Sequence, residues 1–152
     1  MTTHDAVYDD AAADLATEMV SLLGALRGIL TPTLRTDPTP QAVRTLERVE
    51  QGSRCEIPPA EFARVLHDLA RDLVTLRNAR LVFRACDTAD CGIRIVAAHA
   101  GTVAIGAAIT ALVHTTARIT PELALSLAQH TLRTDQDQRR AIARLVASRG
   151  IR

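Results

Sequence analysis

The chain has 152 residues, which is enough for one domain of ordinary size and too few for two. Hydrophobic residues make up 47% and charged residues 23% of it, a balance that argues against a disordered chain. Because only three residues are aromatic and the net charge is +1, we expect neither an aromatic nucleic-acid platform nor a strong global field toward nucleic acid or anionic membranes.

All 18 basic side chains are arginine, and this lysine-free composition, rich in Ala, Leu and Thr, is typical of a GC-rich bacterial genome. The three cysteines (Cys55, Cys86 and Cys91) are odd in number, and the spacing of the last two does not match a pair of zinc ligands. No basic segment followed by an apolar run opens the chain. We therefore expect a cytoplasmic protein with reduced thiols and no cofactor.

The first predicted helix, from about Tyr8 to Leu30, has the clearest periodicity. Apolar residues recur there at alternating spacings of four and three, the pattern of a helix that packs one seam against another helix. This helix is expected to end before Pro32, because proline disfavours helical backbone at the preceding residue. A heptad seam favours association between chains. The candidate interface residues on it are Tyr8, Leu15, Met19, Leu22 and Leu26.

Two further helices follow a connector rich in proline and threonine. Thr39 before Pro40 is typical of an N-cap and a first helical residue, and Gly52 is the expected end of this second helix. The third helix is predicted over about residues 60–85. Its expected buried stripe consists of Phe62, Val65, Leu66, Leu69, Leu73 and Leu76. Arg80 falls on the extension of that stripe, where an unpaired buried charge would be costly. Its side chain is therefore expected either to extend to the edge of the stripe or to be anchored in a polar cleft.

Residues 95–117 carry no formally charged side chain, and Asp87 with Asp90 resembles a capping box ahead of them. The uncharged segment is long enough to cross a bilayer. However, Ala, Gly and Thr occupy fourteen of its twenty-three positions, and such small side chains gain little from lipid. The segment is therefore predicted to form the apolar central helix of a soluble bundle, and membrane insertion is the less favoured alternative.

Two short helices are predicted at the end of the chain. The first begins at Thr120-Pro121, and the second follows Thr134, which forms a capping box with Asp137. Such a pair suggests a helix-turn-helix motif, although its turn lacks the usual glycine. The candidate contacts to nucleic-acid phosphates are Arg139, Arg140, Arg144 and Arg149. Altogether the sequence predicts an all-α fold, with residues 1–152 forming a single bundle of five to six helices around a central apolar helix.

The sequence contains none of the common catalytic motifs. His67, Asp68 and Asp72 lie on adjoining turns of the third helix and are weak candidates for a metal or acid–base site, provided that His99 or His114 approaches them. The favoured alternative is a solvated helix face on which Asp68 pairs locally with Arg71. No metal is therefore expected.

The two ends of the chain carry opposite charge. Residues 1–20 include five acidic residues and no arginine, whereas residues 133–152 include six arginines and two aspartates. We expect these ends to pair either within one chain, with the first helix along the last, or between one protomer and a second protomer or another partner.

We expect a non-enzymatic helical interaction protein, such as an adaptor, scaffold or regulatory subunit, that binds a protein partner or itself as a homo-oligomer. One alternative is a small subunit that contacts nucleic-acid phosphates through arginines without reading sequence. Another is a small helical enzyme or a ligand- or metal-binding bundle.

Overall fold

The computed structural model describes the backbone of residues 3–36, 39–86 and 92–148, and the side chains of these ranges except those of 3–13, 15, 81–86, 92–100, 145, 146 and 148. Over this backbone the chain forms five α-helices and no strand, which confirms the predicted all-α bundle. The elements are α1 (Thr3–Arg35), α2 (Pro40–Ser53), a short 3-10 turn η1 (Pro59–Glu61), α3 (Phe62–Cys86), α4 (Gly92–Ile119) and α5 (Pro121–Ser148).

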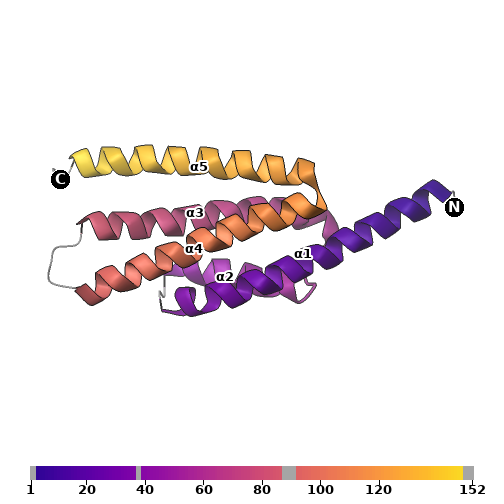
Figure 1. Cartoon of the computed structure of the whole chain (residues 1–152), viewed down its shortest axis with the longest axis horizontal. Coiled ribbons are helices and arrows are strands. Elements are labelled where there is room, and N and C mark those ends of the chain that lie inside the picture. The colour runs from indigo at the N-terminus through magenta and orange to yellow at the C-terminus, as the bar shows by residue number, and fades with distance from the viewer. Residues whose placement is uncertain (1–2, 37–38, 87–91, 149–152) are drawn as a thin grey trace.

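The helices run along one long axis and alternate in direction (Figure 1). α1 and α2 form one antiparallel pair, and α3, α4 and α5 follow as an up-down-up unit. α4 packs against α1, α3 and α5, whereas α3 packs against α2, α4 and α5. Two helices therefore share the interior of the bundle, and the described part of α4 leaves one face exposed.

The core is built from apolar side chains of all five helices. Its largest fully buried members are Met19, Leu23, Leu26, Leu30, Val49, Leu66, Leu69, Leu73, Val74, Ile105, Leu112 and Leu127. The predicted seam of the first helix is confirmed as a packing face at Met19, Leu22 and Leu26. Because these three side chains are buried within their own chain, the folded protomer does not offer them to a partner. The side chains of Tyr8 and Leu15 lie outside the described residues.

α1 does not end before Pro32, as the sequence had predicted, but continues to Arg35. Proline removes its own N–H and crowds the preceding turn, which costs stability without forbidding helical backbone beyond it. Leu30 and Leu34 on either side of this proline are buried in the core. Their packing holds the last turn of α1 in helical conformation.

α2 begins as predicted and ends later than predicted. The hydroxyl of Thr39 accepts a hydrogen bond from the backbone N–H of Ala42 at 3.1 Å, which confirms the N-cap. Gly52 lies within the last turn and is buried against α1, where an added Cβ would lie 2.1 Å from Cδ1 of Leu23. The left-handed residue after the helix is Cys55, with φ of 62°. The glycine therefore serves the close approach of α1 and α2 rather than the turn.

The two short helices predicted at the end of the chain are one continuous helix, α5. Thr134 lies in its middle, so no turn separates two helices here, and the helix-turn-helix interpretation is wrong. A capping sequence marks the start of a helix only where the N-cap residue itself has non-helical φ and ψ angles. Contacts from α5 to α3 on both sides of Thr134 favour continuous helix instead. The capping box predicted at Asp87 and Asp90 lies outside the described residues.

Candidate functional site

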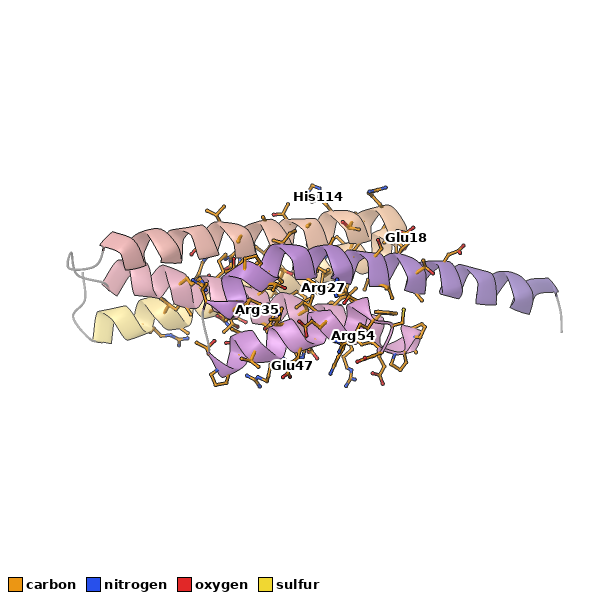
Figure 2. The ribbon with its side chains drawn as sticks, turned by 90° about the horizontal axis from the view of Figure 1, so that it is seen from below. Glu18, Arg27, Arg35, Glu47, Arg54 and His114 are labelled. Carbon is orange, nitrogen blue, oxygen red and sulfur yellow. The ribbon has the colours of Figure 1, made fainter. Side chains whose placement is uncertain are left out.

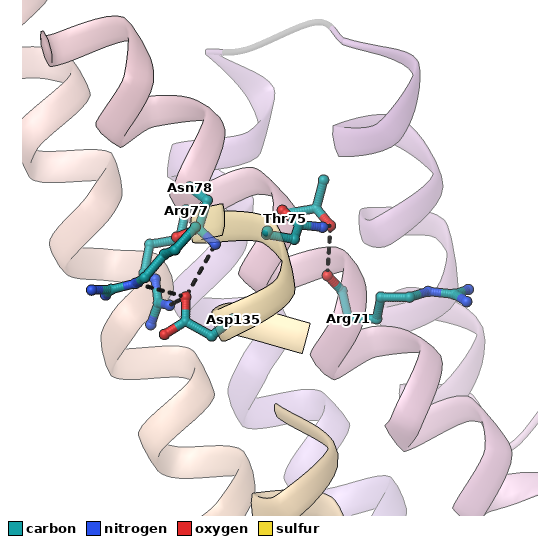
Figure 3. Close-up of polar contacts among 7 residues, drawn as sticks. Arg71, Thr75, Arg77, Asn78 and Asp135 are labelled. Atoms are coloured by element: carbon teal, nitrogen blue, oxygen red, sulfur yellow. Dashed lines mark hydrogen bonds and ion pairs between the residues drawn. The ribbon is translucent and has the colours of Figure 1, made fainter. Parts of the chain in front are cut away.

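An ionic cluster joins the middle of α5 to α3 (Figure 3). Asp135 of α5 accepts hydrogen bonds from Arg77 at 2.5 Å and from Asn78 at 3.1 Å, both on α3, and from Arg139 one turn later at 3.1 Å. Burial raises the pKa of this carboxyl, but the hydrogen bonds from Asn78 and Arg77 and the charge of Arg77 outweigh that effect, so the pKa lies below its ordinary value. Asp135 is therefore held as a carboxylate that ties the two helices together.

A second polar contact reinforces this junction. The side-chain amide of Gln138 donates to the hydroxyl of Thr75, which in turn donates to the backbone carbonyl of Arg71 at 2.9 Å. Asn78 is fully buried, and the side chains of Arg77 and Asp135 are each 18% exposed. These groups pair across the interface and hold α5 in one register, although Nε of Arg77 and Oδ1 of Asn78 have no hydrogen-bond partner there.

A histidine pair lies nearer the start of α5. The rings of His67 on α3 and His130 on α5 meet edge to face, with centroids 4.8 Å apart, and Oγ of Ser126 lies 3.4 Å from Nε2 of His67. Burial, together with the nearby His130, lowers the pKa of His67, while Asp68 opposes the change. The neutral form of His67 is thus favoured in the folded protein.

Among the described side chains, the predicted metal or acid–base constellation does not converge, and the side chain of His99 lies outside them. His67 contacts α5, Asp68 pairs with Arg71 on its own helix at 3.4 Å, and Asp72 pairs with Arg48 of α2 at 2.6 Å. In the part of the chain that the structure describes, no three His, Cys, Asp or Glu side chains group closely enough to hold a metal ion. The local pair of Asp68 and Arg71 agrees with the favoured alternative.

The arginines proposed to contact phosphates divide into three cases. Arg139 is engaged by Asp135, and Arg149 lies outside the described residues. Arg140 and Arg144 are exposed and line an open depression on α5 together with Asp137 and Ala143. All three described arginines of this set are exposed, and Arg139 differs from Arg140 and Arg144 in its ion pair with Asp135.

Arg80, whose place the sequence left open, packs onto α4. A Cβ added at Gly101 would lie 2.4 Å from Nη1 of Arg80, so the guanidinium rests directly on this glycine. The side chain is half-buried rather than spread over the surface. A glycine at this point of α4 gives the arginine its space.

The feature that sequence reasoning missed is an exposed stripe along α4. Its members, called the outer α4 face from here on, are exposed and follow spacings of four and three: Val103, Ala107, Thr110, His114 and Ala117. Figure 2 shows His114 projecting away from the bundle. The hydroxyl of Thr110 is satisfied by the carbonyl of Gly106 at 3.1 Å. Because residues 95–117 carry no charged side chain, no charged stripe marks the outer side of this part of α4, and the sequence held no signal for this face.

α4 also contains the segment whose length and composition resemble those of a transmembrane helix. Within the described residues, Gly101–Ile119 is the one helical stretch that by length and composition alone could cross a membrane, and 28% of it is buried inside the bundle. Ile105, Leu112 and Thr116 point into the core, while the outer α4 face does not. The interpretation of this segment as the central helix is therefore only partly met, because one side of it has no protein cover.

The comparisons leave the family of the chain open. No protein-family model, no curated protein and no solved structure matches it. Its function has to be inferred from the side chains described above.

Proposed function

We propose that this protein is a non-enzymatic helical interaction protein that binds a second copy of itself through the outer α4 face. One observation carries the proposal: this face is exposed over about four turns of helix, from Val103 to Ala117, without a single charged side chain. The other helices carry charges on their exposed sides, as Arg27 and Arg35 on α1 and Glu47 on α2 illustrate (Figure 2).

The physical reason is the cost of removing water. Charged residues are depleted at the centres of protein interfaces because their desolvation is expensive, whereas a face made mainly of Val, Ala and Thr side chains loses little when it is covered. Small side chains such as Ala107 and Ala117 also let two helix backbones approach closely. An uncharged exposed surface of this length is more readily explained by a partner helix than by solvent alone.

The test compares two alanine-to-arginine substitutions that are both exposed. Ala107→Arg places a charge on the outer α4 face, and Ala79→Arg places the same charge on the exposed side of α3. Light scattering coupled to gel filtration should give the wild type a mass above the 16.4 kDa of one chain, rising with concentration. Ala107→Arg should shift this equilibrium to the monomer, and Ala79→Arg should leave it unchanged. A wild-type mass of one chain at every concentration would overturn the proposal.

The exposed Arg140 and Arg144 support one second candidate, a subunit that contacts nucleic-acid phosphates without reading sequence. Such binding weakens steeply as salt rises, because it releases counterions. Arg140→Gln with Arg144→Gln should then lower the affinity for an unspecific DNA duplex and flatten the salt dependence. If the wild type shows no binding to duplex even at low salt, this candidate is excluded.

A further inference from the structure

Opposite charges lie at opposite ends of the folded molecule. Figure 1 shows the N-terminal half of α1 extending beyond one end of the bundle, while α5 finishes at the other end. Asp14 and Glu18 are exposed on α1, and Arg140 and Arg144 are exposed near the end of α5. α1 packs against α2 and α4 rather than along α5, so the described acidic residues of α1 and the described arginines at the end of α5 do not pair within one chain.

The outer α4 face lies between these ends. α4 packs against α1, α3 and α5, and toward the C-terminal end of α5 the helix α3 lies between α4 and α5 (Figure 1). A second molecule that covers the outer α4 face would therefore run alongside the whole bundle. Its direction then decides which ends meet.

We infer that two copies of this chain pair antiparallel through their outer α4 faces, with the acidic end of each protomer beside the basic end of the other. This inference rests on the proposed self-association and adds its geometry. A parallel pair would bring acidic end to acidic end and basic end to basic end, which like charges oppose. The uncharged outer α4 faces do not repel each other in either the parallel or the antiparallel pair. The charged ends therefore select the antiparallel orientation.

The spacing of side chains along α4 suits this arrangement. Thr110 lies midway between Val103 and Ala117, so a two-fold axis near it pairs the two ends of the stripe with each other. Under that register His114, the largest side chain of the face, lies opposite Gly106 of the partner. A Cβ added at Gly106 would meet nothing within 4 Å, so there is open space above this glycine to receive a ring.

The antiparallel pair also explains why a closed dimer is favoured over a filament. Head-to-tail docking of acidic on basic ends would satisfy the charges but would leave every outer α4 face exposed. A two-fold pair covers the outer α4 face of both protomers. It also brings the acidic end of each protomer beside the basic end of the other, so that one dimer contains two such contacts. The expected product is a dimer whose mass does not grow further with concentration.

Paired charge reversals test the inference. One variant carries Asp14→Arg and Glu18→Arg, and the other carries Arg140→Glu and Arg144→Glu. In about 0.1 M salt, where the Debye length is about 10 Å, each variant alone should dimerise about tenfold more weakly than the wild type. An equimolar mixture should regain the dimer, because each reversed end then meets an end of opposite charge. Glu47→Arg, an exposed reversal on α2, is the control for charge change alone.

Sedimentation equilibrium separates the outcomes, with circular dichroism to confirm that each variant is folded. Loss in each variant, recovery on mixing and a limiting mass of two chains support the antiparallel dimer. Dimers that are insensitive to both reversals overturn the orientation but leave the proposed self-association standing, as does a mass that grows beyond two chains. A wild type that stays monomeric at all concentrations overturns both.

Discussion

Single polar side chains hold α5 to the rest of the bundle. Beyond Leu127, none of the described side chains of α5 is fully buried, so these described side chains gain little from apolar packing. Its attachment rests on Asp135, Gln138 and their partners on α3. Polar contacts of this kind contribute modestly when made but are costly when one partner is removed.

We expect Asp135→Ala to lower the free energy of unfolding by about 1–3 kcal/mol, because it leaves Arg77 and Asn78 without their shared acceptor. The matched control is Asp137→Ala, which removes an exposed carboxylate from the same turn of α5 and should change stability far less. Urea unfolding followed by circular dichroism measures both. Equal losses in the two variants would contradict the role given to Asp135.

The same carboxylate makes stability depend on pH in the acid range. The pKa of Asp135 is lower in the folded than in the unfolded protein, so its contribution is complete above the ordinary value of 3.8 and is lost as pH falls through the folded pKa. The difference in unfolding free energy between wild type and Asp135→Asn should therefore shrink as the pH is lowered beneath 3.8.

His67 makes stability depend on pH nearer neutrality. Its pKa lies below the ordinary 6.5 in the folded protein, because it is buried and faces His130, with Asp68 opposing. The unfolded chain therefore takes up the proton first, and stability should fall as pH drops below 6.5. His67→Gln should reduce this loss. Urea unfolding above and below this pH provides the measurement.

At the scale of elements, the end of α2 shows how a helix terminates without the expected glycine. The N–H of Glu56 bonds back to the carbonyl of Gln51 at 3.0 Å, and the residue between helix and loop, Cys55, adopts positive φ. This conformation costs a non-glycine residue about 1–2 kcal/mol. The glycine lies three residues before Cys55, at position 52. There Leu23 leaves no room for a side chain, so the close packing of α1 and α2 requires a glycine.

Cys55→Gly should therefore raise the free energy of unfolding by about 0.5–1 kcal/mol, because relief of the left-handed strain exceeds the extra backbone entropy of glycine. Cys55→Ala, which keeps a Cβ at the same φ, should leave stability nearly unchanged. Thermal unfolding of the two variants under reducing conditions is the measurement. A lower melting temperature for the glycine variant would speak against strain at this position.

At the scale of the whole molecule, α4 is buried on one side and exposed on the other, although residues 95–117 within it carry no charged side chain. Its inner side supplies Ile105, Ala108 and Leu112 to the core, and its outer side faces solvent in the single chain. The inner residues of α4 stabilise the bundle, because their apolar surface is buried against α1, α3 and α5.

We expect Leu112→Ala to destabilise the fold by about 2–5 kcal/mol in detergent-free buffer, as for a large side chain removed from a packed core. Leu132→Ala on α5, where the leucine is 58% exposed, is the control and should cost far less. Urea unfolding gives both values. A wild type that can be purified only with detergent would instead favour the membrane alternative.

The sequence by itself determined what depends on local chemistry. Period and composition specified an all-α chain, Thr39 with Pro40 specified the start of α2, and the stripe from Phe62 to Leu76 specified which side of α3 is buried. Each of these follows from residues within a few turns of one another. The same local rules failed where distant parts of the chain meet, at Pro32, at Gly52 and at Thr134.

Only the tertiary structure decided where α1 and α5 end, which partners His67 and Asp72 take, and which side of α4 faces outward. These outcomes depend on contacts between residues far apart in sequence, such as the 57 positions that separate Asn78 from Asp135. A charged helix shows its solvent side in its sequence, because burying an ion is costly. α4 lacks that mark over residues 95–117, so packing against its neighbours alone selected its buried and exposed faces.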